Sequence, residues 1–292
     1  MSDPVPSSVT AVVVAFNSAH VLPACLKALS AEGVRAIVVD NASADTSVAV
    51  ARRHGARVIR NDANQGYGRA NNHGVAAADT PYVLICNPDL VARPGMVAAL
   101  LQAVARRPKA ALFGPRLIEP DGRENERSES LLSTGPVARR PEGDTPVAML
   151  TGACLLMRRE LFMEMGGFDP NIFLFYEDDD LCRRLRDRGY DLVRVRAAAA
   201  DHARGGSCYD VPGIVRLSRF HQARSRVYVA RKYGLNPAMT GLIVTSALKY
   251  LLAVAAGHVL RRERYGGTLA GAWSALAEPG PATRPVAAEV RS

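Results

Sequence analysis

Short apolar runs, many of them β-branched, alternate along the first part of the chain with segments in which apolar residues recur every three or four positions. The runs predict buried strands, and the second pattern predicts helices. The expected strands are 10–16, 36–40, 56–60, 82–86 and 110–113, and the expected helices are 20–29, 46–54, 70–78 and 96–106. Strands that alternate with helices in this order predict βαβ units, and therefore an α/β fold with a mostly parallel sheet.

Polar residues stand at the carboxyl ends of three expected strands. Asn17 follows the first strand, Asp40 ends the second, and Asn87 and Asp89 follow the fourth. Right-handed crossovers bring the carboxyl ends of parallel strands to one edge, and ligands of such sheets bind outside that edge. The sequence therefore predicts a binding site where these side chains meet.

The second half of the chain has a different pattern. Residues 119–145 are polar and rich in Pro and Gly, which predicts a surface loop, and residues 149–157 are apolar again. Residues 177–188 predict a helix that has an acidic first turn, Leu181 and Leu185 on one face, and Gly189 as its end. From residue 213 to about 260 we expect helices.

Composition and charge narrow the possible functions. The chain has 292 residues, 48% hydrophobic and 22% charged, which is typical of a globular protein and excludes a disordered chain or a rod. The formal net charge is +9. Two interpretations of this positive charge stay open. It reflects a compositional bias towards arginine, or it attracts an anionic partner such as a nucleotide or a membrane surface. Aromatic residues make up 6% and no nucleic-acid motif occurs, so we expect no nucleic-acid partner.

The cysteines and the amino terminus indicate a cytoplasmic protein. The five cysteines form no CxxC pair, so we expect reduced, mostly buried thiols and no structural zinc site. They are Cys25, Cys86, Cys154, Cys182 and Cys208. The first six residues lack the basic and apolar regions of a secretory signal, so we expect none.

Several polar segments have both a structural and a chemical interpretation. Asp40 suits a base N–H or a ribose hydroxyl, although the polar residues that follow it are also suited to cap a helix. Asn87-Pro88-Asp89 is an ordinary turn or a ligand of Mg²⁺ or Mn²⁺ carried by a diphosphate. The Gly-rich residues 64–74 precede a helix and would allow close approach of phosphate, but they match neither a Walker loop nor GxGxxG.

Four acids in succession, Glu177 to Asp180, exceed what a helix amino terminus needs. Their mutual repulsion would raise some of their pKa values, and a raised carboxylate pKa suits a general base. His202 is either a structural histidine or a ligand of metal or phosphate.

Taken in order, the motifs resemble those of the family 2 inverting glycosyltransferases with the GT-A fold, and within them the bacterial rhamnosyltransferase-like branch. The resemblance covers about residues 9–233. Its motifs are Phe16-Asn17-Ser18, Asp40-Asn41, residues 64–71, Asn87-Pro88-Asp89, Thr151-Gly152-Ala153, residues 166–169 and residues 175–181.

The resemblance implies an organisation in three parts. Residues 1–212 would form a Rossmann-like GT-A domain that binds the nucleotide sugar and carries the catalytic residues. Residues 213–265 would form a basic, amphipathic helical extension, and residues 266–292 a loose tail.

The resemblance also implies a role for individual residues. Asp178 would be the catalytic base, with Glu177 orienting the acceptor and Asp180 in support. Asp89 would bind Mg²⁺ or Mn²⁺ as the single acid of the family's DxD element, with His202 as a further ligand. The donor-binding residues would be Phe16, Asn17, Asp40, Asn41, Gly66, Arg69, Asn71 and Asn87.

The implied reaction transfers a sugar, with rhamnose from dTDP-L-rhamnose preferred, to a hydroxyl of a glycan or of a polyprenyl-diphosphate-linked glycan in cell-envelope polysaccharide synthesis. A sugar nucleotidyltransferase and a non-catalytic nucleotide-sugar-binding protein are the alternatives. The first would carry a Gly-rich loop with Arg and Lys after the first strand, which residues 15–18 do not supply.

The carboxyl-terminal part suggests where the acceptor is met. Residues 216–264 combine basic residues with the apolar stretch 238–260, which Lys249 and His258 make unsuitable for a membrane span. Either an interfacial helix at the inner face of the membrane, or a helical cap or homodimer contact, would explain this stretch. Both interpretations stay open from the sequence.

Overall fold

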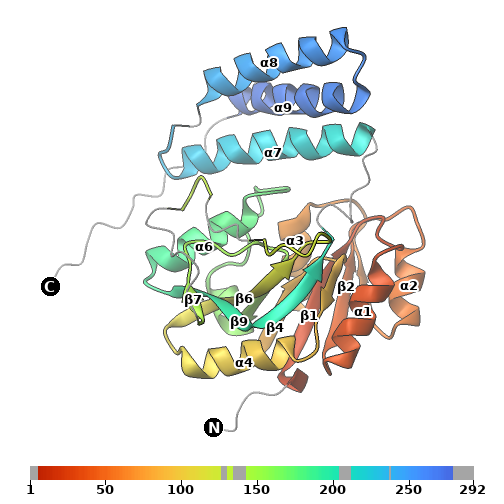
Figure 1. Cartoon of the computed structure of the whole chain (residues 1–292), viewed down its shortest axis with the longest axis vertical. Helices are drawn as coiled ribbons and strands as arrows, with labels where there is room; N and C mark the ends of the chain where they lie inside the picture. Colours follow the sequence, from red (N-terminus) through yellow and green to blue (C-terminus); the bar gives the residue numbers. More distant parts are fainter. Residues whose placement is uncertain (1–5, 126–129, 134–142, 204–211, 237, 279–292) are drawn as a thin grey trace, which may run out of the picture. The chain divides into compact units, whose positions relative to one another are not determined.

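The computed structural model describes residues 6–125, 130–133, 143–203, 212–236 and 238–278 (Figure 1). The chain forms two compact units, which we describe separately. The first unit comprises the residues up to 173 together with 177–207, and the second comprises 174–176 and the residues from 208 onward.

A mixed sheet is the centre of the first unit. In its described part the strands follow the order β3-β2-β1-β4-β8-β6-β9-β5, with β7 paired to β9. The strands are β1 (Val9–Ala15), β2 (Arg35–Asp40), β3 (Arg57–Arg60), β4 (Tyr82–Cys86), β5 (Leu90–Ala92), β6 (Ala110–Ile118), β7 (Thr145–Pro146), β8 (Cys154–Arg158) and β9 (Asp191–His202).

Helices cover both faces of this sheet, as the α/β pattern predicts. On β1, Ala11 and Val13 join a core cluster with α1, α2 and α4, whereas Val12 and Val14 join another with α3, α5 and α6. A strand that is buried on both faces needs apolar residues at every position, which explains the unbroken run in β1. The helices are α1 (Leu22–Ala31), α2 (Ser47–Arg53), α3 (Tyr67–Ala76), α4 (Met96–Arg106), α5 (Arg159–Glu164) and α6 (Glu177–Asp187), preceded by the short 3₁₀ helix η1 (Pro6–Ser8).

The expectation of a mostly parallel sheet holds for half of it. β1 pairs in parallel with β2 and β4, and β2 with β3. β8, however, lies antiparallel to both β4 and β6, and β9 is parallel to β6 but antiparallel to β5 and β7. β9 is not predictable from the sequence, because this twelve-residue strand contains a run of alanines, which have low β propensity, and alternating arginines.

The second unit is built from α7 (Pro212–Lys232), α8 (Met239–Ala255) and α9 (Val259–Ala277). α9 contacts both α7 and α8 (Figure 1). A Cβ at Gly267 or Gly271 of α9 would collide with the backbone of α7, so these glycines allow close packing. The prediction that residues 266–292 form a loose tail is therefore wrong for 266–277, while 279–292 lie outside the described residues.

Within the ranges given above, no helix combines the length and apolar character that crossing a bilayer requires. The four described cysteines, Cys25, Cys86, Cys154 and Cys182, are buried and unpaired as disulfides. Cys208 and much of the expected loop 119–145 lie outside the described residues.

Candidate active site

The register of the strands brings the expected site residues to one edge of the sheet. Asp40 at the end of β2 lies beside Ala15 at the end of β1, and Cys86 at the end of β4 pairs with Val13 of β1. The segments that follow these strands therefore start at a common edge. β8 begins at the same edge, because its first residue, Cys154, pairs with Cys86.

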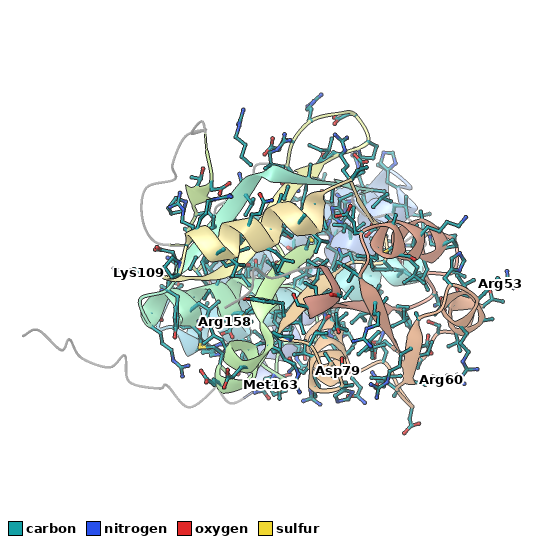
Figure 2. All side chains as sticks on the ribbon, turned by 90° about the horizontal axis from the view of Figure 1, so that it is seen from below. Arg53, Arg60, Asp79, Lys109, Arg158 and Met163 are labelled. Atoms are coloured by element: carbon teal, nitrogen blue, oxygen red, sulfur yellow. The ribbon has the colours of Figure 1, made fainter. Side chains whose placement is uncertain are left out.

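Asp40 is a fully buried carboxylate without a complete set of partners. Neither of its oxygens accepts a hydrogen bond from the described residues, and the nearest cation, Nε of Arg60, lies 3.6 Å from Oδ2. The Arg60 side chain is 63% exposed (Figure 2), so water screens this pair. A buried carboxylate in this state favours a ligand that donates an N–H or O–H group.

Asn17 ties the loop after β1 to the loop after β2. Its backbone N–H donates to Oγ of Ser43 over 2.9 Å, and its Oδ1 accepts from the N–H of Ala44 over 2.8 Å. The neighbouring Phe16 is half-buried and donates its N–H to Oγ of Ser18. The side-chain oxygen of Asn17 is thus already used in holding the two loops together.

The side-chain amide of Asn41 is fully engaged within the protein. Its Nδ2 donates to Asn64 Oδ1 and to the carbonyl of Gly66, and its Oδ1 accepts from Asn61 Nδ2 and from the N–H of Gln65, over 2.8–3.2 Å. Two donors and two acceptors occupy all positions of this amide in the described structure. The side chain of Asn41 therefore holds the loop 61–66, and the expected role of this residue in donor binding stays a prediction.

The Gly-rich segment packs α3 onto the residues that precede α6. Gly66 has φ +86°, and a Cβ there would collide with the carbonyl oxygen of Phe173, which accepts from the N–H of Tyr67 over 2.9 Å. Arg69, expected near the base or diphosphate, is an exposed side chain whose Nε donates to the carbonyl of Pro170 over 2.6 Å. Asn71 is fully buried on α3 and donates its Nδ2 to the carbonyl of Tyr67.

Asn72 explains the motif at residues 166–169, although the sequence analysis assigned it no role. Its Nδ2 donates to the carbonyl of Phe168 and its Oδ1 accepts from the N–H of the same residue, each over 2.9 Å. Gly167 has φ +65°, and a side chain there would press on the Asn72 amide. This contact fixes the segment that leads to the acidic helix α6.

Asp89 and His202 face each other at the end of β4. β5 and β9 pair antiparallel with Leu90 opposite His202, and Nε2 of His202 lies 3.4 Å from Oδ1 of Asp89. The Asp89 side chain is 1% exposed. Asn87 places its Nδ2 3.2 Å from the same His202 nitrogen. The structure therefore brings together three residues that the sequence separates by up to 115 positions.

This arrangement fits a divalent cation. Both oxygens of Asp89 are buried and accept no hydrogen bond from the described residues, and carboxylate oxygen and imidazole nitrogen are suitable ligands for Mn²⁺. In the described part of the chain, no cluster of three or more His, Cys, Asp and Glu side chains could hold a metal. Further ligands would have to come from a diphosphate or from water.

Asp178 is held by the turn that precedes β8. Its Oδ2 accepts from the N–H of Gly152 over 2.7 Å, and its Oδ1 accepts from the N–H of Asp179 over 2.9 Å. Tyr67 donates its hydroxyl to the carbonyl of Gly152 over 2.8 Å and so anchors the same turn. A side chain at Gly152 would lie close to both Asp178 and Tyr67. Tyr67 and Gly152 thus support the carboxylate that the resemblance assigns as the base.

The same turn links Asp178 to the residues at the end of β4. The N–H of Asn87 donates to the carbonyl of Ala153 over 3.0 Å, and the adjacent Gly152 donates to Asp178. Asp89 and Asp178 are therefore connected through one turn at one edge of the sheet.

Glu177, the first of the four acids, has a strongly shifted pKa. Burial raises the pKa of its carboxyl well above the ordinary value, and the nearby charges of Asp178 and Asp179 add to the effect. The Glu177 side chain is buried, and its Oε2 accepts no hydrogen bond from the described residues. The repulsion expected within the acidic run thus acts on Glu177.

Asp180 has a structural partner. Its carboxylate is fully buried and its Oδ2 lies 2.7 Å from Nε of Arg184, one turn later on α6. Arg184 also donates to the carbonyls of Met165 and Gly167 over 2.8 and 2.7 Å. Asp180 therefore acts through Arg184 on the segment before α6, as a positioning residue.

Strained backbone occurs next to several of these motifs in the chain. Five non-glycine residues of the described chain have positive φ, and Asn17, Ala42, Phe175 and Tyr176 are four of them. Left-handed conformations cost these residue types free energy, and such strain often marks functional sites. Asn17 is itself a candidate site residue, Ala42 follows Asp40 by two positions, and Phe175 and Tyr176 directly precede Glu177.

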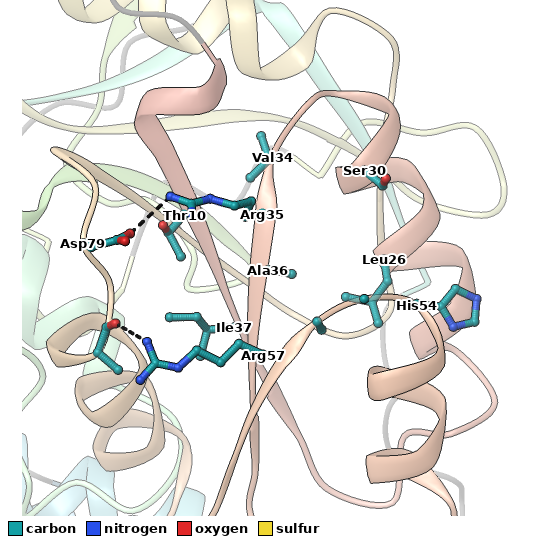
Figure 3. Close-up of a pocket in the computed structure, with 13 residues that line it drawn as sticks. Thr10, Leu26, Ser30, Val34, Arg35, Ala36, Ile37, His54, Arg57 and Asp79 are labelled. Atoms are coloured by element: carbon teal, nitrogen blue, oxygen red, sulfur yellow. Dashed lines mark hydrogen bonds and ion pairs between the residues drawn. The ribbon is translucent and has the colours of Figure 1, made fainter.

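A hollow of about 350 Å³ lies elsewhere, at the amino ends of the parallel strands (Figure 3). Thr10 of β1, Arg35 of β2 and Arg57 of β3 line it. Arg35 pairs with Asp79 over 3.3 Å, and Arg57 donates to the carbonyl of Ala77 over 2.9 Å. Its cations are thus engaged, and its position at the opposite strand ends separates it from the candidate site.

Comparison with known proteins shows the family to which the chain is similar. A family model described as glycosyl transferase family 2 matches residues 10–166. An N-acetylglucosaminyl-diphospho-decaprenol L-rhamnosyltransferase of Mycobacterium tuberculosis is 34% identical over 208 residues, which cover 60% of this chain and 68% of that protein. A pre-mycofactocin glycosyltransferase of the same organism is 31% identical over 211 residues, which cover 69% of this chain and 44% of that protein.

The solved structures support the fold. A mannosyltransferase of Pyrobaculum calidifontis in complex with GDP-Man and Mn²⁺ is similar with a TM-score of 0.57 at 16% identity, over 94% of this chain and 89% of that one. At this identity the similarity concerns the fold, which is the GT-A fold expected from the motifs.

Proposed function

This chain belongs to glycosyl transferase family 2 and is a glycosyltransferase, and we propose that it inverts the anomeric configuration while moving a sugar from a nucleotide diphosphate to a hydroxyl group. We assign the reaction to the first unit. The observation that carries the proposal is the turn at Gly152 and Ala153, which holds Asp178 on one side and the strand end before Asp89 on the other. A single displacement at a sugar carbon requires a proton acceptor close to a cation ligand, and this turn connects the segments that carry Asp178 and Asp89.

In the proposed reaction, Asp178 accepts the proton of the acceptor hydroxyl as the oxygen attacks the anomeric carbon. The bond from that carbon to the diphosphate oxygen breaks in the same step, and the electron pair leaves with the diphosphate. The N–H groups of Gly152 and Asp179 fix the Asp178 carboxylate for this transfer. No covalent intermediate is needed, so the configuration inverts once.

Asp89 and His202 would hold Mg²⁺ or Mn²⁺, which supplies positive charge next to the departing diphosphate when bound. Asn87 places its Nδ2 3.2 Å from Nε2 of His202, next to the position that the cation would take. Asp40 would accept a hydrogen bond from the base or ribose of the donor, since both of its buried oxygens remain available.

For the substrates we propose a rhamnosyl donor, dTDP-L-rhamnose, and a lipid-linked glycan acceptor. The support is the mycobacterial relative, which is named as an L-rhamnosyltransferase that acts on N-acetylglucosaminyl-diphospho-decaprenol. Such a reaction belongs to the synthesis of cell-envelope polysaccharide.

The test compares Asp178→Asn with the parent in an assay for dTDP release from dTDP-L-rhamnose in the presence of Mn²⁺ and a lipid-linked N-acetylglucosamine acceptor. Loss of a general base costs on the order of 10²–10⁴ in rate, so transfer is expected to fall by that factor. The donor is expected to raise the melting temperatures of parent and variant equally, because Asp178 is not assigned to hold the nucleotide.

Asp187→Asn is the matched control, since Asp187 lies on the same helix in an exposed pair with Arg183 and should leave transfer unchanged. Full transfer by Asp178→Asn would refute the assignment of the base. Formation of the nucleotide sugar from a sugar phosphate and a nucleoside triphosphate would identify a nucleotidyltransferase instead.

A further inference from the structure

The outer face of α8 and the start of α9 expose large apolar side chains. We call this set the α8 patch, and its members are 41–63% exposed. They are Val244, Leu248, Leu251, Leu252, Val259 and Leu260. The first four are spaced by three, four, seven and eight positions, which places them on one side of the helix.

A helix that packs in a layer normally buries its large apolar side chains and exposes small or polar ones, and α8 does the opposite. The residues that α8 buries are Ser246 and Ala253, both small, while Leu248, Leu251 and Leu252 are exposed. α9 is the helix that α8 contacts within the second unit. Exposed apolar patches of this kind mark surfaces that bind another apolar phase or partner.

Cations border the α8 patch. Lys249 lies within the sequence of the patch, with its Nζ 5.8 Å from the ring centre of Tyr265, and Arg261, Arg262 and Arg264 follow Leu260 directly. Glu263 is the one acidic residue between positions 239 and 264. Leucine and valine flanked by arginine and lysine form the pattern of a helix that lies in the interface of an anionic bilayer.

We propose that the α8 patch docks on an anionic lipid surface, with α8 lying in the plane of the membrane and the arginines at the headgroups. A bilayer offers both an apolar interior and negative charge, which match the two features of this surface. A second copy of the chain would instead bring its own arginines towards these ones, and like charges across an interface are unfavourable. The inference deepens the proposed function, because a lipid-linked acceptor is presented at such a surface.

The first experiment measures sedimentation of the full chain with vesicles of phosphatidylcholine, alone or mixed with phosphatidylglycerol. The parent is expected to bind the mixed vesicles more tightly than the neutral ones. Leu251→Glu and Leu252→Glu are each expected to weaken binding about tenfold, since each removes one buried leucine. The matched control is Met163→Glu, because Met163 on α5 is 46% exposed and lies outside the patch (Figure 2).

A double variant tests the contribution of the arginines to binding. Arg261→Gln together with Arg262→Gln is expected to remove most of the preference for phosphatidylglycerol, about fivefold per arginine, and to leave binding to neutral vesicles unchanged. Circular dichroism and melting temperatures of all variants confirm that each is folded.

Several results would overturn the inference. These are a parent that fails to bind the anionic vesicles, leucine variants that bind like the parent, or a Met163→Glu variant that loses binding equally. Analytical ultracentrifugation that finds a dimer, dissociated by Leu251→Glu and indifferent to vesicles, would assign the patch to a second copy. Binding of Asp178→Asn to vesicles is expected to equal that of the parent, so failure of the catalytic proposal and failure of this one are separable.

Discussion

The ion pair between Asp180 and Arg184 offers the sharpest test of how α6 is held in place. Removing the guanidinium by Arg184→Met leaves a carboxylate that is fully buried, and it also removes the donors to the carbonyls of Met165 and Gly167. The chain must then keep a buried charge that has lost this ion pair, or protonate Asp180. Either outcome destabilises the folded state relative to the unfolded one.

The magnitude follows from this burial. Breaking a buried pair by removing one partner costs about 3–5 kcal/mol, and the 19% exposure of Arg184 places the expected loss towards the lower end of that range. In a domain of this size the loss corresponds to roughly 6–20 °C in melting temperature. Since Asp180→Asn removes the charge that Arg184 compensates, the double variant is expected to lose about 1–3 kcal/mol less than the sum of the single variants.

The assay is urea unfolding of the parent, the two single variants and the double variant, and the same helix provides the control. Arg183 and Asp187 form an i,i+4 pair of the same 2.7 Å length, but the Asp187 carboxylate is 50% exposed. Arg183→Met is therefore expected to cost less than about 1 kcal/mol. Equal losses for Arg183→Met and Arg184→Met, or strict additivity in the Asp180 cycle, would refute the argument from burial.

Three further predictions concern the site. Burial raises the pKa of the Glu177 carboxyl well above its ordinary 4.5, so the unfolded chain loses this proton at lower pH than the folded one, and the free energy of unfolding falls by up to about 1.4 kcal/mol per pH unit between the two pKa values. Glu177→Gln is expected to flatten this pH dependence in urea unfolding from pH 4 upward. An unchanged slope would exclude Glu177 as its source. Asp89→Asn removes a buried carboxylate and is expected to stabilise the metal-free protein by about 1–3 kcal/mol. Mn²⁺ is expected to raise the melting temperature of the parent but not that of the variant, and an equal rise in both would contradict the ligand role. Gly66→Ala is expected to lower the free energy of unfolding by more than about 2 kcal/mol and Gly55→Ala by about 1 kcal/mol. Both glycines have positive φ, but only a Cβ at Gly66 would collide with the Phe173 carbonyl. Equal shifts of the urea unfolding midpoint in the two variants would contradict this collision.

Much of the first half of the sheet is predictable from the sequence, because its signals are local. The strands β1, β2, β4 and the helices between them each carry their own periodicity, and the right-handed crossover rule then fixes which strand ends meet. Periodicity and this rule together are therefore enough to place Asp40 and Asn87 at one edge. The glycosyltransferase family followed from motifs that are likewise contiguous in the chain.

The second half shows where that reasoning ends. β9 has an alanine-rich sequence that predicts no strand by itself, and it becomes one because β5, β6 and β7 supply the hydrogen bonds. Residues 266–277 were expected to belong to a tail, yet they form the second half of α9, where Gly267 and Gly271 allow close packing on α7. In both cases tertiary contacts override a low local propensity.

The sequence by itself determined which residue types the site draws on: acids and asparagines at the ends of strands, acids at the start of α6, and one histidine, His202, whose strand it did not predict. Only the tertiary structure decided what each one does. Asn41 is occupied by four bonds within the protein, Asp180 is neutralised by Arg184, and Asp178 is held by a turn 26 residues before it. The reason is that a side chain's role depends on which partners exhaust its hydrogen bonds and on how much water it loses, and both depend on residues distant in the chain.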